Sequence, residues 1–183
     1  MTTTRKVAIA AFLLAGATLA NAANPEVGGA PMFENKNIIE NAVNSKDHTT
    51  LVAAVKAAGL VETLQGKGPF TVLAPVNSAF DALPAGTVDT LLKPESKDQL
   101  TKILTCHVIG ANALSSAITK MVADGGGTHA VETVGGCTLS LMTKNGKVMI
   151  KDEAGNTATV TIADVKQSNG VIHVIDKVLL PKG

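Results

Sequence analysis

The chain has 183 residues, of which 45% are hydrophobic and 17% charged, with 16 Lys and Arg against 15 Asp and Glu. This length is typical of one domain, and a chain this apolar is not intrinsically disordered. The formal net charge of +1 supplies no field that would attract nucleic acid. With no Trp, no Tyr and only four Phe, the chain also lacks the flat aromatic faces on which bases and many sugars stack.

Residues 1–22 have the three parts of a secretory signal peptide. Arg5 and Lys6 form a cationic start, residues 7–20 are an apolar run, and small residues follow at the spacing of a signal peptidase site. We expect cleavage between Ala22 and Ala23. The alternative is a membrane anchor, but the run is shorter than the roughly 20 residues that span a bilayer. The expected product is exported, periplasmic or secreted, with no membrane span in the mature chain.

Export changes what the two cysteines imply. In an oxidising compartment an even pair favours a disulfide, here between Cys106 and Cys137. The alternative is two buried free thiols, which behave as small apolar side chains. The choice depends on whether the two Cα atoms come within about 7 Å of each other, which the sequence does not determine.

Residues 23–36 contain two Pro, two Gly and no periodicity, which predicts a flexible leader before the domain. Regular structure is expected from about residue 37, where apolar residues begin to recur at helical spacing. A helix is also expected around residues 88–92, and another after Pro94. The remaining helices are expected to begin at polar capping residues, namely Asp47, with Gly59 ending that helix, Asn77 and Asn112.

The second half of the chain changes to the two-residue period of strands. Strands are expected at residues 129–134, 137–143, 148–151 and 157–162, and Asn145-Gly146 and Asn169-Gly170 are typical of hairpin turns. A short buried strand in the first half ends at Pro75. Helices concentrated in one half and strands in the other predict the α+β class, in a single domain.

Two longer segments stand out. Residues 68–80 read GPFTVLAPVNSAF, and residues 169–181 read NGVIHVIDKVLLP. They resemble the first and second homology boxes of the fasciclin (FAS1) domain family, in the expected order. The resemblance covers residues 37–181 and implies a single FAS1 domain of a bacterial secreted type. It further implies a fold with helices of the first half packed on a β-sheet or wedge from the second half, and a role in adhesion or binding.

Both boxes are interpreted mainly as folding signatures. In the first, a strand delivers the chain to a Pro, and a helix follows whose Phe folds back onto the core; in the second, a tight turn feeds a terminal strand. The family-motif residues, to which we assign a mainly structural role, are Phe70, Thr71, Ala74, Pro75, Asn77, Phe80, His107, Asn169, Gly170, His173 and Asp176.

Between the boxes, Cys106-His107 occupies the place where family members usually carry a Tyr-His pair. That region has been linked to integrin binding in animal members of the family. Because Cys106 replaces the Tyr, we do not assign a receptor site to His107.

No motif predicts catalysis, a metal site or a cofactor. In a strand, adjacent side chains point to opposite faces, so His107 is not placed to activate Cys106 as a nucleophile. The four His have no metal-binding spacing, and no CxxC is present. We expect His107 and His173 to be residues at the edge of the core with satisfied ring nitrogens, and the acidic residues 151–156 to be a solvated hairpin tip.

Two functional classes remain. The first is a non-catalytic interaction module that binds a protein or surface polymer of the cell envelope or an extracellular partner. The alternative is a carrier of a small hydrophobic ligand, carotenoid-like or lipid-like, in an apolar groove. A sizeable concave apolar pocket would favour the carrier, and its absence would favour the interaction module.

Overall fold

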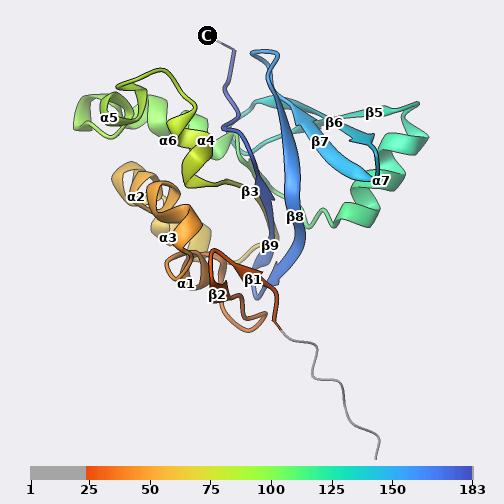
Figure 1. The fold of residues 1–183 in the computed structure, drawn as a ribbon, viewed down its shortest axis with the longest axis horizontal. Helices are drawn as coiled ribbons and strands as arrows, with labels where there is room; N and C mark the ends of the chain where they lie inside the picture. The colour runs from red at the N-terminus through yellow and green to blue at the C-terminus, as the bar shows by residue number, and fades with distance from the viewer. Residues whose placement is uncertain (1–23, 183) are drawn as a thin grey trace, which may run out of the picture.

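A computed structural model of the protein describes residues 24–182 (Figure 1). The expected signal peptide and its cleavage site at Ala22 and Ala23 lie outside the described residues. The helices are α1 (Ile38–Ala42), α2 (Thr49–Ala58), α3 (Val61–Gln65), α4 (Asn77–Asp81), α5 (Thr87–Leu91), α6 (Lys97–Thr105) and α7 (Ser115–Asp124), with the 3-10 turns η1 (Lys46–His48) and η2 (Pro94–Ser96). The strands are β1 (Glu26–Val27), β2 (Ala30–Pro31), β3 (Phe70–Pro75), β4 (Val108–Ile109), β5 (Thr128–Glu132), β6 (Thr138–Lys144), β7 (Lys147–Lys151), β8 (Thr157–Gln167) and β9 (Gly170–Ile175).

Seven of the strands form one sheet, in the order β4-β3-β9-β8-β7-β6-β5. Only β3 and β9 pair in parallel; the other neighbours in this sheet are antiparallel. Helices α1 to α6 lie on one side of β3 and β9, and α7 lies on the other side of the molecule, beside β5, β6 and β7 (Figure 1). The α+β prediction, with helices mainly in the first half and the sheet mainly from the second, is confirmed.

The central strands β3 and β9 are buried on both faces. Val72 and Ala74 of β3 belong to the core under α1 to α6, whereas Leu73 between them belongs to the core under α7. Strand β9 divides in the same way, with Val174 on the first side and Ile175 on the second. This follows from the alternation of side chains along a strand. The two segments that resemble family boxes therefore join the two halves of the hydrophobic core.

The leader prediction is wrong for residues 24–36. They form the hairpin β1–β2, closed by Gly28 and Gly29 at φ values of 60° and 73°. Val27 is 4% exposed and Met32 2% exposed, and the Met32 N–H donates to the Pro25 carbonyl. The two Gly that suggested a linker form a tight turn, Pro25 precedes β1 and Pro31 is part of β2, and the buried apolar residues are too few to give a period.

Three predicted caps are also wrong. Asp47 lies inside η1, and Asn112 precedes α7 without capping it. The first N–H of α7, from Ser115, donates instead to Asp164 Oδ1 on β8 at 2.6 Å. Helix α4 begins after Val76, so Asn77 is its first residue and its side chain is used elsewhere. At α7 a side chain distant in sequence therefore takes the place of the predicted cap.

Candidate functional site

The two family-like segments lie side by side although about 100 residues separate them. Strand β3 pairs with β9 from Phe70 opposite Gly170 to Pro75 opposite Ile175. The backbones approach so closely that a Cβ on Gly170 would overlap the carbonyl of Phe70, and one on Gly68 would overlap the carbonyl of Asn169. Glycine at these two positions is a requirement of the pairing.

The side chain of Asn169 ties this pair of strands to the helices. Its Oδ1 accepts from the Ile38 N–H at 3.1 Å, at the start of α1. Its Nδ2 donates to the carbonyls of Leu64 at 2.8 Å and Gly66 at 3.0 Å. One amide therefore fixes α1, the end of α3 and the β8–β9 turn relative to one another.

Asn77 has a similar role at the start of α2. Its Oδ1 accepts from the Thr50 N–H and from the Thr49 hydroxyl, both at 3.1 Å, and its Nδ2 donates to the Lys46 carbonyl at 2.8 Å. A side chain in the first family-like segment thus caps a helix 27 residues earlier in the chain. Asp176, in the second segment, accepts from the Thr159 N–H on β8 at 2.7 Å.

His173 and Thr71 hold the segment that leads into α7. His173 is 1% exposed, its Nε2 donates to the Ala113 carbonyl at 2.7 Å, and its Nδ1 accepts from the Asp164 N–H at 3.2 Å. The Thr71 hydroxyl donates to the Ala111 carbonyl at 2.6 Å and accepts from the Ala113 N–H at 2.8 Å. Burial lowers the pKa of His173, which keeps it neutral as both bonds require.

A Ser, an Asp and a His meet here, but their arrangement is not that of a nucleophile and its base. Ser115 Oγ donates to Asp164 Oδ2, and it is the backbone of Asp164, not its carboxylate, that bonds to His173. In a catalytic triad the His would lie between the hydroxyl and the carboxylate. The cluster closes the start of α7 onto the sheet.

His107 joins α6 to the C-terminal segment. It is 2% exposed, its Nδ1 donates to the Ile103 carbonyl at 2.8 Å, and its Nε2 accepts from the Leu179 N–H at 2.9 Å. Burial lowers its pKa to about 4, against smaller opposing effects of the Ile103 carbonyl and the Asp152 carboxylate. The prediction that the ring nitrogens of His107 and His173 are satisfied agrees with these contacts.

The hairpin tip at residues 151–156 is not simply solvated. Asp152 is 5% exposed and accepts from the N–H groups of Asn156 at 2.7 Å and Leu180 at 2.8 Å. Glu153 accepts from the Thr138 and Lys182 N–H groups, both at 3.0 Å, and these bonds lower its pKa. The acidic residues therefore hold the C-terminal segment against the sheet, a role that their short spacing in the sequence does not indicate.

Cys106 and Cys137 form the predicted disulfide, with their Cα atoms 5.3 Å apart. Both residues are buried, at 1% and 2% exposure. The bond ties the end of α6 to the start of β6.

His48 is the histidine whose role sequence analysis does not predict. It is 3% exposed, its Nδ1 lies 2.8 Å from Ser45 Oγ, and its Nε2 has no hydrogen-bond partner within residues 24–182. Burial lowers its pKa, partly offset by the Ala74 backbone and Asp47. It borders a small apolar cavity beneath the N-terminal hairpin, with a volume of about 30 Å³.

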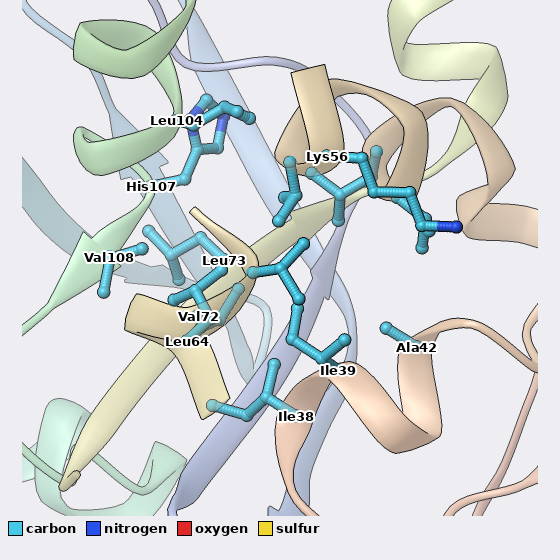
Figure 2. Close-up of a pocket in the computed structure, with 14 residues that line it drawn as sticks. Ile38, Ile39, Ala42, Lys56, Leu64, Val72, Leu73, Leu104, His107 and Val108 are labelled. Atoms are coloured by element: carbon cyan, nitrogen blue, oxygen red, sulfur yellow. The ribbon is translucent and has the colours of Figure 1, made fainter. Parts of the chain in front are cut away.

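A second apolar pocket lies between α1, α2 and β3 (Figure 2). Ile38 and Ile39 line it from α1, Val72 from β3, and Leu104 and His107 from α6 and the residues after it. Its volume is also about 30 Å³. Pockets that hold drug-sized ligands have volumes of roughly 300–1,000 Å³, so neither cavity accommodates a carotenoid or a lipid in this conformation.

The described part of the chain contains no cluster of three or more His, Cys, Asp or Glu arranged to bind a metal ion. Within the same residues, no helix has the length and apolar character needed to cross a membrane.

Comparison with known proteins identifies the family. The Fasciclin domain profile matches residues 46–181, most of the chain. The protein belongs to the fasciclin domain family. The match begins at η1, so the hairpin β1–β2 and helix α1 of this FAS1 protein precede the matched region.

Curated relatives span bacteria and animals. The chain is 50% identical over 144 residues to Protein sll1483 of Synechocystis sp., a match that covers 79% of this chain and 73% of that protein. It is 37% identical over 145 residues to the cell surface glycolipoprotein MPB83 of Mycobacterium bovis, covering 76% and 58%. The transforming growth factor-beta-induced protein ig-h3 of Sus scrofa is 37% identical over 131 residues, covering 72% of this chain and 17% of that protein.

Among solved structures, the FAS1 domain pair from the insect cell adhesion molecule Fasciclin I matches with a TM-score of 0.54 and 22% identity. The match covers 71% of this chain and 43% of that chain. At this identity the likeness supports the fold alone, and the fold agrees with the FAS1 resemblance of the two boxes.

Proposed function

We propose that this FAS1 protein is an exported, non-catalytic interaction module that binds a protein or polymer of the cell envelope or the extracellular space. The signal-peptide pattern of residues 1–22 supports export. Of the similar proteins, MPB83 is named as a cell surface glycolipoprotein and Fasciclin I as a cell adhesion molecule.

One structural observation carries the non-catalytic part of the proposal. In both family boxes, the buried and half-buried polar side chains that the fold positions are bonded to the protein's own backbone. His173, Asn169 and Thr71 each bond to at least two backbone groups. Side chains held in this way are positioned to maintain the scaffold, and a buried neutral His with both nitrogens bonded has no free lone pair for a substrate. Function is then expected at the surface loops that the scaffold supports.

The proposal is tested on whole cells and on envelope fragments of the source organism. The mature protein from Ala23, carrying a fluorescent label, should bind in a saturable manner, and excess unlabelled protein should compete. Binding that never saturates, or that a heat-unfolded sample reproduces, would contradict an interaction module. Export is checked separately by mass spectrometry of the tagged full-length chain, which should give an N-terminus at Ala23 in the periplasmic or released fraction.

A further inference from the structure

A polar groove lies where the two family boxes meet. It is bordered by the loop before β3, the β8–β9 turn, the start of α1 and the segment after β4, and its volume is about 560 Å³. Gly66 and Gly68, which are half-buried, and the buried Gly170 form part of its wall. The groove is much larger than either apolar cavity and falls in the size range of ligand sites.

Two side chains that line the groove, Asn169 and Gln167, are held by hydrogen bonds within the protein. Asn169 uses both atoms of its amide to fix the start of α1 and the end of α3. Gln167 bonds to Asn41 and to the Val165 carbonyl. These contacts hold the walls in place before any ligand arrives, which reduces the ordering that binding would require.

Most of the other polar side chains of the groove are free; the exception is Asn37, whose Oδ1 accepts from the Glu40 N–H at 2.9 Å. Gln65, Lys67, Asn112 and Ser168 are exposed, and within residues 24–182 their side chains form no hydrogen bond or ion pair. None of the residues that line the groove is Asp or Glu. The lining therefore offers one positive charge, amide and hydroxyl groups, and no fixed negative charge.

Two carboxylates of neighbouring segments have partners of their own. Glu40 accepts from the Asn37 backbone N–H at 2.8 Å, and Glu34 lies 3.8 Å from Lys166. Lys67 is thus the charged group that the groove itself supplies. A Lys flanked by amides and a hydroxyl is suited to a ligand that is rich in acceptor oxygens and carries a negative charge.

We propose that this groove binds a carboxylate-bearing sugar unit of an acidic polysaccharide, with Lys67 pairing with the carboxylate. The inference rests on the proposed function and names the class of partner. A protein partner is usually anchored by large apolar or aromatic side chains, and Pro69 is the only apolar side chain among the described residues of this lining. A neutral sugar would need an aromatic stacking face, which is also absent from the lining. Hydrogen bonds and a single ion pair are the remaining means of recognition, and sugar hydroxyls suit the amides of Gln65 and Asn112.

The test uses a trimer of galacturonic acid and the same trimer with its carboxylates converted to methyl esters, titrated into ¹⁵N-labelled mature protein. The acidic trimer should shift amide signals of residues 65–68, 70, 112 and 167–170, and the ester should bind at least about tenfold more weakly because the charge-assisted bond is lost. Lys67→Ala should weaken binding of the acid to a similar degree, and higher salt should weaken it further.

Lys93→Ala is the matched control, because Lys93 is an exposed Lys beside α5, far from the β8–β9 turn in Figure 1. It should leave binding unchanged. Four results would each overturn the groove assignment. These are equal affinity for the acid and the ester, an equal loss of affinity in the two Lys variants, amide shifts spread over segments around other lysines, and no binding of the acid at all. If Lys67→Glu still binds envelope fragments as the wild type does, the groove inference fails while the proposed function stands. If the wild type binds no envelope component, the proposed function itself fails.

Discussion

His107 makes the stability of this domain dependent on pH, because burial lowers the pKa of its ring. In the unfolded chain its pKa is near 6.5, and in the folded protein burial lowers it to about 4. Between these values the unfolded chain takes up a proton that the folded protein does not, so the unfolded state is favoured as the pH falls. The contribution of neutral, buried His107 to the free energy of unfolding is present in full above pH 6.5 and is lost as the pH falls to about 4.

The magnitude follows from the difference between the two pKa values. At about 1.4 kcal/mol for each pKa unit, the loss from His107 alone is about 3 kcal/mol. His48 and His173 also have lowered pKa values, so they act in the same direction. The bonding pattern gives the same sign, because a protonated His107 would present a donor to the Leu179 N–H, which is itself a donor.

The assay is urea unfolding followed by far-ultraviolet circular dichroism, since the chain has no Trp or Tyr to serve as a fluorescence probe. Measurements at pH 7 and pH 4 on the wild type and on His107→Gln separate this residue from the other titrating groups. The Gln carbonyl is able to accept from the Leu179 N–H and does not titrate. The wild type should lose about 3 kcal/mol more than the variant over this interval. If both proteins lose the same amount, with both folded at pH 7, the reasoning on His107 is refuted.

Other parts of the scaffold give further stability predictions, each checked by urea unfolding. Replacing Cys106 and Cys137 together with Ala should lower the unfolding free energy by about 3–4 kcal/mol, and the native protein should take up no alkylating label without reductant. Asn169→Ala should cost about 2–4 kcal/mol because three backbone groups lose their partner. Met32→Ala should cost about 2–5 kcal/mol, whereas Val43→Ala, at a residue 49% exposed, should stay within about 0.5 kcal/mol. If the Met32 variant were as stable as the wild type, the conclusion that the N-terminal hairpin segment packs into the core would be wrong.

Local sequence patterns were sufficient for the elements whose stabilising contacts are local. Gly59 ends α2 in the left-handed conformation at φ 74°, and Asn145-Gly146 forms the β6–β7 turn with φ values of 53° and 74°. The strand predicted at residues 157–162 forms as part of β8, and its side-chain alternation places Ala158 and Val160 in the core. In these cases the residue type and its immediate neighbours determine the conformation.

The helix starts show where local patterns fail. Asp47 and Asn112 have the right chemistry for caps and the right distance from an apolar run, yet Asn77 and Asp164 supply the side-chain acceptors at the starts of α2 and α7. These acceptors are 27 and 49 residues away in sequence. A single sequence contains no signal for such a pairing, because any Asn or Asp in a loop is chemically equivalent until the fold positions it.

The same reasoning explains why the family boxes could be recognised while the groove beside them could not. Asn169 and Gly170 are constrained by the close β3–β9 approach and by three backbone bonds, so their identities are tied to the fold. Gln65, at the end of α3, and Lys67 and Ser168, on the adjoining loops, lie next to them, and their side chains form no hydrogen bond or ion pair within residues 24–182. Residues of this second kind are free to be selected for binding, because changing them leaves the scaffold intact. A FAS1 scaffold whose family-box side chains Thr71, Asn169 and His173 are bonded to its own backbone can therefore present different partner chemistry at this junction. Lys67 is the residue that we expect to determine which partner binds in this protein.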